Sequence, residues 1–282
     1  MEPQYSAGVE FDEQSQNNGK KQRTLVQKAA RALHYPFTQR LSLLKSLYFN
    51  LNYFPFKVAV RLPVFIYRGV RLKQMKGRIH LNFGQVETGS VRIGKSNYGF
   101  HTRQHQTIWE QKGGTVILGK EIFMGKGTFI SVGKNACLKI GRQVKLGGND
   151  KVICNQFITL GARTMVAWDV QIVDTDFHRT LNTVFKTHSS AQRPIVIGER
   201  NWLGFGCTIL KGTVTPNRCI IAANTTLRND FSGEGENIVL GQDQTAKVTA
   251  RYISFEEQTI EEADEEGIFD VVVRMRNKRR AI

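Results

Sequence analysis

The amino-acid sequence predicts an all-β solenoid of stacked triangular turns, and a repeat of six residues is the main evidence. Aliphatic or threonine residues recur at every sixth position in three runs, within residues 118–130, 140–170 and 197–227. A helix would need a period of 3.6 residues and a flat strand a period of 2, so neither explains the pattern. Six residues with one inward side chain form one short strand and one corner, and three such units close one turn.

The repeat is regular enough to predict the core. Of its fifteen positions, thirteen are aliphatic and two are threonine. Glycine often follows and supplies the backbone angles of a corner. We expect these fifteen side chains to form one buried ladder: Leu118, Met124, Ile130, Ile140, Leu146, Val152, Ile158, Thr164, Val170, Ile197, Leu203, Ile209, Thr215, Ile221 and Leu227.

Two breaks interrupt the ladder, between Ile130 and Ile140 and between Val170 and Ile197. Solenoids place such insertions in loops on one face, and these loops often carry function. The second break is the longer one and contains two of the six histidines, His178 and His188. We therefore expect the functional site near this second insertion.

Composition bounds the class of protein. The 282 residues are 40% hydrophobic, which excludes wholesale disorder. The net charge is +16, and residues 20–78 hold fourteen Lys/Arg without Asp or Glu. Four cysteines, none in a Cys-x-x-Cys pair, are read as reduced packing thiols: Cys137, Cys154, Cys207 and Cys219. Residues 1–22 lack a signal-peptide core, and no apolar stretch is long enough to span a membrane, so we expect a cytoplasmic protein.

The chain is expected to have four parts: a disordered tail (1–22), a basic amphipathic N-terminal arm with short helices (23–78), the solenoid (79–232) and a C-terminal extension (233–282). For the basic arm, two interpretations stand side by side: docking on anionic lipid, with the protein peripheral to the inner face of the membrane, and capping of the solenoid end. Nucleic-acid binding is not expected, because no known binding module is visible.

Three passages resemble the hexapeptide-repeat acyltransferases, which fold as left-handed parallel β-helices. Residues 168–180 (WDVQIVDTDFHRT) resemble the entry to the histidine loop of sugar O-acetyltransferases, and residues 194–227 resemble their C-terminal coils. Residues 51–72 resemble the leader of acetyltransferases from bacterial capsule and lipopolysaccharide clusters. The resemblance implies a homotrimer that transfers acetyl from acetyl-CoA to a saccharide hydroxyl, in a surface polysaccharide or its lipid-linked precursor.

The histidine loop provides the candidate catalytic residues. His178 matches the family histidine and has the residue type best suited to act as general base near neutral pH. Asp174 and Asp176 precede it, and either could orient the imidazole or cap the turn of the loop. His188 is the second candidate base. No covalent acyl-enzyme is expected, because no serine or cysteine has a visible base partner.

The resemblance also implies a coenzyme groove. Its expected residues are Asn201, Trp202, Gly204, Gly206, Ala222, Ala223, Lys247 and Arg251. A backbone amide near Gly204 would stabilise the oxyanion, while Lys247 and Arg251 would reach a phosphate. The family usually ends its helix with a Gly-Asn-Pro-Ala-Lys-like motif, whereas residues 241–248 read GQDQTAKV and lack the proline.

Three alternatives stay open from the sequence. His101 and His105 are four residues apart, but no third histidine lies at a fitting position, so no metal site is expected. Acetylation of an amino sugar nitrogen would use the same histidine base. A non-catalytic β-helix scaffold is the third alternative, favoured by the altered GQDQTAKV segment and the long C-terminal extension.

Overall fold

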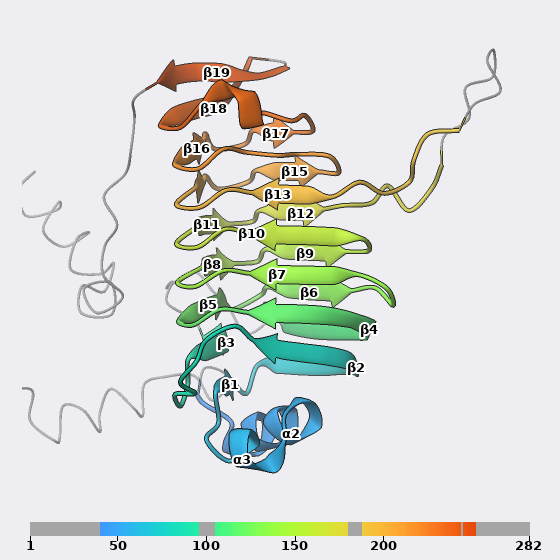
Figure 1. The fold of residues 1–282 in the computed structure, drawn as a ribbon, viewed down its shortest axis with the longest axis vertical. Helices are drawn as coiled ribbons and strands as arrows, with labels where there is room; N and C mark the ends of the chain where they lie inside the picture. Colours follow the sequence, from blue (N-terminus) through green and yellow to red (C-terminus); the bar gives the residue numbers. More distant parts are fainter. Residues whose placement is uncertain (1–39, 96–104, 180–187, 244, 252–282) are drawn as a thin grey trace, which may run out of the picture. The chain divides into compact units, whose positions relative to one another are not determined.

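Short parallel strands stack in coils that form the three faces of a prism in this computed structural model (Figure 1). The structure describes residues 40–95, 105–179, 188–243 and 245–251. Three-sided coils are what the six-residue repeat predicts, since each unit contributes one strand and one corner. The fold is a left-handed parallel β-helix, as the sequence indicated.

The first face is one sheet in the order β1-β3-β5-β8-β11-β14-β16-β18-β19. Its strands are β1 (Val64–Ile66), β3 (Val91–Lys95), β5 (Ile122–Gly125), β8 (Lys145–Gly148), β11 (Met165–Trp168), β14 (Trp202–Leu203), β16 (Cys219–Ile221), β18 (Ile238–Asp243) and β19 (Thr245–Arg251). All pairs are parallel except β18 and β19, whose antiparallel pairing closes this end of the stack.

The second and third faces share two long strands, β2 (Val70–Leu81) and β4 (Thr107–Leu118). β4 pairs with β6 through residues 108–111 and with β7 through residues 115–118, so it bends around one corner. The second face continues with β6 (Phe129–Val132), β9 (Lys151–Cys154), β12 (Gln171–Val173), β15 (Thr208–Leu210) and β17 (Thr226–Leu227). The third continues with β7 (Cys137–Ile140), β10 (Phe157–Leu160) and β13 (Ile195–Ile197).

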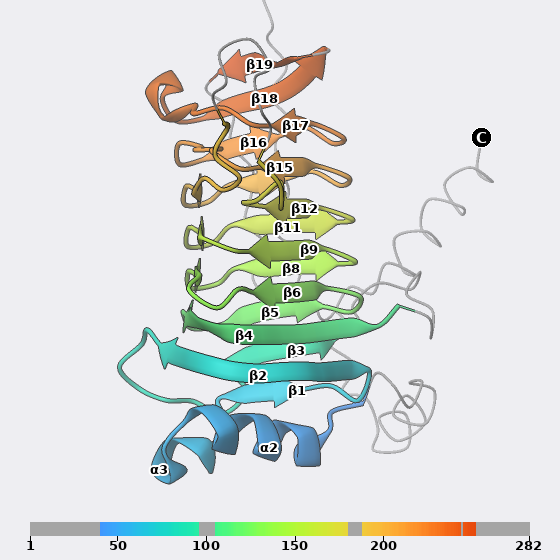
Figure 2. The ribbon, with the colours of Figure 1, turned by 90° about the vertical axis from the view of Figure 1, so that its right-hand side faces the viewer.

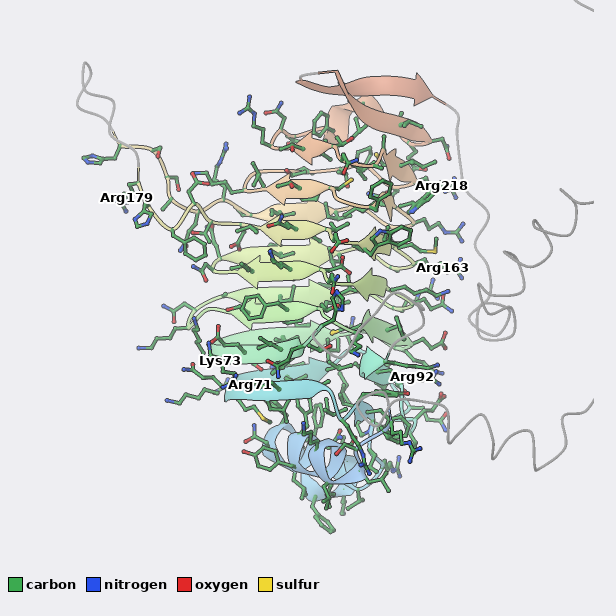
Figure 3. The ribbon with its side chains drawn as sticks, turned by 180° about the vertical axis from the view of Figure 1, so that it is seen from behind. Arg71, Lys73, Arg92, Arg163, Arg179 and Arg218 are labelled. Atoms are coloured by element: carbon green, nitrogen blue, oxygen red, sulfur yellow. The ribbon has the colours of Figure 1, made fainter. Side chains whose placement is uncertain are left out.

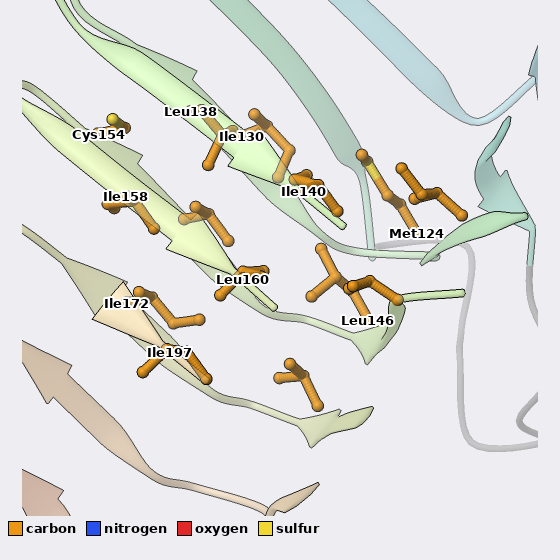
Figure 4. Close-up of a cluster of buried hydrophobic side chains, with 14 of the residues drawn as sticks. Met124, Ile130, Leu138, Ile140, Leu146, Cys154, Ile158, Leu160, Ile172 and Ile197 are labelled. Carbon is orange, nitrogen blue, oxygen red and sulfur yellow. The ribbon is translucent and has the colours of Figure 1, made fainter. Parts of the chain in front are cut away.

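The interior ladder is confirmed. All fifteen predicted positions are buried, each with no more than 3% of its surface exposed. Figure 4 shows how equivalent residues of successive coils, such as Ile140 and Leu160, stack along the axis. Glycine is needed where coils approach each other most closely: a Cβ on Gly125 would lie 2.0 Å from the carbonyl oxygen of Gly147.

The N-terminal end of the stack is capped by two helices, α2 (Leu43–Tyr53) and α3 (Phe56–Ala59) (Figure 2). The Ser42 side chain caps α2 by accepting the N–H of Lys45 at 3.3 Å. The inner side of α2 buries Ser46, Phe49 and Asn50 against the first coil, where the amide of Asn50 pairs with the backbone of Val64. The capping interpretation of the basic segment therefore holds for this part of it.

The coils extend beyond the predicted solenoid boundaries of 79 and 232. β1 and most of β2 precede residue 79, and β18 follows residue 232 as a parallel neighbour of β16. The predicted tail of 1–22, the part of the predicted N-terminal arm before residue 40 and the end of the C-terminal extension lie outside the described residues. The four cysteines are free thiols, and three of them are fully buried, as expected for packing residues. No helix in the described ranges is long and apolar enough to cross a membrane.

Candidate active site

An arm leaves the prism at the corner between the second and third faces, between β12 and β13 (Figure 1). Its two described limbs, residues 174–179 and 188–193, begin as a narrow antiparallel pair. Thr175 and Gln192 form an isolated bridge, and the N–H of Asp176 donates to the carbonyl of Ala191 at 2.9 Å. The described residues of the second insertion predicted from the sequence therefore form a paired base that projects from the prism.

Asp174 anchors the arm to the coil below it. The residue is fully buried, and its two carboxylate oxygens accept the N–H groups of Asn155 (2.7 Å), Gln156 (2.8 Å) and Phe157 (2.8 Å). Of the two roles considered for this residue, the contacts are those of a turn cap. The carboxylate fixes the point at which the chain leaves the prism.

Asp176 also serves the base of the arm. Its carboxylate pairs with the ammonium group of Lys211 on the following coil. The same ammonium group donates to the carbonyl oxygen of Ser190 on the returning limb. Lys211 thus ties both limbs to the prism, and Asp176 contacts this lysine rather than a histidine in the described part of the chain.

His178 lies on the outgoing limb and is exposed to solvent. The residue before it, Phe177, has a left-handed backbone with φ of 62°, and its N–H donates to the Thr175 hydroxyl at 2.9 Å. Ten other non-glycine residues among those described have a positive φ, many of them at the corners of the coils, so this angle marks a turn of the arm and does not by itself indicate function. The turn lies just before His178. The second candidate base, His188, is exposed on the returning limb.

A cavity of about 620 Å³ lies between the second face and the base of the arm. Its walls come from β4, β6 and β9, from the corner residues beside them and from the arm. The lining residues are Glu110, Lys112, Phe129, Ser131, Gly133, Lys134, Asn135, Ile153, Asn155, Phe177 and Gln192. The mixture of lysine, amide and aromatic groups suits a polar ligand with apolar ring faces, and His178 directly follows one of its walls.

Glu110 is the buried charge of this cavity. Its carboxylate contacts Lys73 at 2.9 Å, Lys112 at 3.1 Å and the Ser131 hydroxyl at 2.9 Å. Burial acts to raise the pKa of Glu110, but the two ammonium groups and the hydroxyl outweigh it, so the pKa is lowered and the group stays ionised. Lys73 lies on the same side of the solenoid as the arm with Arg179, whereas Arg163 and Arg218 lie at the opposite edge (Figure 3).

Most of the expected coenzyme residues lie at two corners of the coils. Asn201 is at the corner between the third and first faces, and Gly204 and Gly206 are at the corner between the first and second faces. Asn201 is fully buried: its amide group donates to the Thr215 hydroxyl at 2.6 Å and accepts the N–H of Cys219 at 2.7 Å. This side chain holds two coils together and is used internally. Trp202 is 40% exposed on the outer side of β14, between Met165 and Ile220 of the adjacent coils.

The backbone amides expected at the oxyanion already have partners. The N–H of Gly204 donates to the carbonyl of Ile221 at 2.8 Å, and that of Gly206 donates to Trp168 at 3.1 Å. Gly204 also permits close packing, because a Cβ there would lie 2.7 Å from the N atom of Ala223. The structure therefore gives these glycines a role in stacking the coils.

The remaining expected residues lie at the C-terminal end. Ala222 is half-buried and Ala223 is exposed in the corner next to Gly204. Lys247 and Arg251 belong to β19, where their backbones pair with Gly241 and Ile238. The described residues of the GQDQTAKV segment thus belong to the antiparallel pair of β18 and β19 that ends the sheet. These four residues lie on coils C-terminal to the arm.

The metal alternative involves His101, which lies outside the described residues, and His105, which is half-buried just before β4. Among the described residues, no group of three or more His, Cys, Asp or Glu side chains is placed to hold a metal ion.

The three-sided coils define the class of fold, a left-handed parallel β-helix built from six-residue units. Within this class the chain is similar to WbbJ of Escherichia coli strain K12, whose assignment as a lipopolysaccharide biosynthesis O-acetyl transferase is itself provisional. The two are 24% identical over 147 residues, which is 49% of this chain and 73% of the relative. The resemblance to sugar O-acetyltransferases expected from the sequence is therefore found. No family model matches the chain.

Two solved structures are also similar. The polySia-specific acetyltransferase NeuO has a TM-score of 0.49 and 18% identity, over 73% of this chain and 80% of that one. The polysialic acid O-acetyltransferase OatWY has a TM-score of 0.37 and 17% identity, over 71% of this chain and 91% of that one.

Sequence reasoning missed the cluster of Glu110, Lys73 and Lys112. These residues lie on β2 and β4, outside the six-residue lattice from which the site was sought. A signal was present, because Glu110 is the only acidic residue between Glu87 and Glu121 and Lys112 follows it by two residues.

Proposed function

We propose that this protein is an O-acetyltransferase that moves an acetyl group from acetyl-CoA to a hydroxyl group of a saccharide, in a surface polysaccharide or its precursor. The observation that carries the proposal is the histidine-bearing arm, anchored by Asp174 beside a cavity that is lined by both charged and apolar side chains. The similarity to an O-acetyl transferase assigned to lipopolysaccharide biosynthesis supports the reaction class.

In the proposed reaction, His178 accepts the proton of the acceptor hydroxyl as this oxygen attacks the thioester carbonyl. The new bond is C–O and the bond that breaks is C–S. The proton then passes from the imidazolium to the departing coenzyme A thiolate, which regenerates the base. Transfer is proposed to be direct, and the thiols of Cys154, Cys207 and Cys219 are too buried to serve as nucleophiles.

In this scheme, Asp174 and Asp176 act by positioning the arm that carries His178. Asp174 is a positioning residue, since it holds the point where the arm leaves the prism. Asp176 fixes Lys211, which binds the returning limb. The N–H groups of Gly204 and Gly206 already donate hydrogen bonds to other coils. We therefore propose that a different hydrogen-bond donor stabilises the oxyanion.

We place the acetyl-CoA along the outer surface of the coils C-terminal to the arm. Trp202 would cover the pantetheine arm there, next to the small residues Ala222 and Ala223. Lys247 and Arg251 are proposed as charge partners of a phosphate. A donor of this kind implies a cytoplasmic enzyme.

A homotrimer is part of the proposal. The arm projects away from its own coils (Figure 1), so His178 would meet a neighbouring copy that completes the cleft. The stacked rings of Trp168 and Phe205, with centroids 5.7 Å apart, are partly exposed at a corner and offer an apolar contact to such a copy.

The test is to incubate the full chain with acetyl-CoA and a panel of sugars and lipid-linked saccharides and to follow thiol release. His178→Ala should lower acceptor-dependent release by about a hundredfold to ten-thousandfold. The matched control is His80→Ala, an exposed histidine on β2 that should leave the rate unchanged.

Other outcomes distinguish the alternatives. Activity that survives in His178→Ala but is lost in His188→Ala would move the base to the returning limb. Hydroxylamine should release the acetyl group from the product, because an ester is cleaved whereas an amide resists. A chain that releases no thiol with any acceptor, and whose melting temperature coenzyme A does not raise, would be a scaffold.

A further inference from the structure

The two capping helices present an apolar surface to the outside of the molecule. Leu44 is 83% exposed and Phe56 is 72% exposed, and five further large apolar side chains around them are exposed as well. We name this set the outer cap surface; it consists of Leu43, Leu44, Leu47, Tyr48, Leu51, Phe56 and Val60. It holds most of the exposed large hydrophobic side chains found in the described part of the chain.

The outer cap surface is one continuous side of α2 continued by α3. Leu44, Leu47, Leu51 and Tyr48 are three or four residues apart, so they share one side of the helix. The opposite side, with Phe49, is already packed on the first coil. The helix is therefore apolar on both sides, although the outer side of a solenoid cap is normally polar.

Positive charge borders this surface. Lys57 and Arg61 are exposed on and next to α3, and neither has an ion pair within the described residues. No Asp or Glu occurs between residues 20 and 86. Glu87 comes near Arg61 in the fold, because Thr88 donates to the Arg61 carbonyl at 2.8 Å, but the Glu87 carboxylate is paired with Lys120 at 2.7 Å. An apolar centre with a basic rim and no unpaired acid is a surface for an anionic, apolar partner.

We infer that the outer cap surface docks on an anionic membrane, with its leucines and Phe56 in the boundary between headgroups and acyl chains. Lys57 and Arg61 then contact the lipid phosphates. The contact is interfacial: α2 has 11 residues, too few to span a bilayer. This inference concerns where the protein resides, and it does not depend on the proposed reaction.

Charge argues against two other occupants. Residues 20–39 of the same chain carry five Lys/Arg and no acid, so folding them over the outer cap surface would bring like charges together. A symmetric contact with a second copy would likewise place Lys57 and Arg61 of one copy against those of the other. A phospholipid surface is the occupant that complements both the apolar and the charged groups.

The experiment is flotation of the full chain with vesicles of phosphatidylcholine alone and of phosphatidylcholine mixed with phosphatidylglycerol. The wild type should float with the anionic vesicles. Leu44→Ser with Leu51→Ser should lower this binding at least about tenfold, because two apolar side chains no longer enter the boundary. Lys57→Gln with Arg61→Gln should lower it about fivefold per charge, and only on anionic vesicles.

The matched control is Lys139→Gln with Lys151→Gln, which removes the same charge from exposed positions on β7 and β9 and should leave binding unchanged. Circular dichroism verifies the fold of each variant. Binding that is unaffected by both cap variants, or equally affected by the control, overturns the inference. The inference is also overturned if the wild type does not bind vesicles and the replacement of Leu44 and Leu51 changes the oligomeric state instead. Transfer to a soluble saccharide should be unchanged in all variants, so the inference and the proposed function fail separately.

Discussion

The carboxylate of Asp174 accepts the backbone N–H of Asn155 at 2.7 Å, across one full coil of the helix. The amides of the next two residues share the same carboxylate. The residue that begins the histidine arm is therefore bound to the corner directly below it. His178 is the fourth residue after this anchor, so we expect its position to depend on the bond.

Asp174→Asn should destabilise the fold by about 1–2 kcal/mol, because an amide group leaves at least one of the three partly buried N–H groups without its acceptor. Urea denaturation measures this change. The control is Asp169→Asn, an exposed residue at a left-handed corner that asparagine tolerates, expected within about 0.5 kcal/mol of the wild type. Equal stabilities of the two variants would contradict the anchoring role.

The coil could be predicted from the sequence because its rule is local. Each inward residue, such as Ile158, is specified by the residues six positions away, and burial follows without knowledge of distant partners. The role of Asp174 could not be predicted in this way. Its partners precede it by 17 to 19 residues, a separation set by the length of one coil rather than by any motif.

The sequence did not predict the first coil, for a related reason. Strand β2 contains Arg71, Lys73 and Lys76, so its composition resembles a charged arm. Only one side of such a strand has to be apolar, and β2 has few buried residues because β4 alone pairs with it. Likewise, helical spacing of leucines in α2 predicted the helix but not that its apolar outer side would stay exposed.

Glu110→Gln should lower stability at neutral pH by about 1–2 kcal/mol, because it removes the charge that pairs with Lys73 and Lys112. The pKa of Glu110 is lowered in the folded state, so this stabilisation is complete above the ordinary carboxyl pKa and is lost as the pH falls through the folded value. Urea denaturation at neutral and at acidic pH tests the sign.

The difference between wild type and Glu110→Gln should therefore shrink in acid. The control for this variant is Glu87→Gln, which breaks an exposed pair with Lys120 and should cost less than about 0.5 kcal/mol. A Glu110→Gln penalty that grows toward acid would contradict the lowered pKa.

Gly125→Ala should destabilise the coil by more than about 2 kcal/mol. The added Cβ would lie 2.0 Å from the backbone oxygen of Gly147, which cannot move without separating the two coils. Gly84→Ala is the control, since no atom lies within 4 Å of its added Cβ, and it should be neutral or slightly stabilising. Equal melting temperatures for the two variants would show that the backbone at this corner can shift to accommodate the added methyl group.

Trp202→Ala should raise the KM for acetyl-CoA about tenfold while changing kcat little, if the indole covers the bound donor as proposed. The side chain is 40% exposed, so the melting temperature should fall only slightly. The control is Phe56→Ala, which removes an exposed aromatic side chain from the capping helix α3 and should leave the KM for acetyl-CoA unchanged with a soluble acceptor. A KM that changes equally in both variants would contradict a contact between Trp202 and the donor.

The four thiols should differ sharply in reactivity. Cys154, Cys207 and Cys219 are fully buried, and burial raises their pKa values, that of Cys219 to about 12, so little thiolate forms near neutral pH. Cys137 is half-buried on β7. Ellman's reagent should therefore modify at most one thiol in the native chain and four after denaturation. Cys137→Ser should abolish the native reaction. Rapid labelling of that variant would mean that the coils open locally and expose the interior ladder.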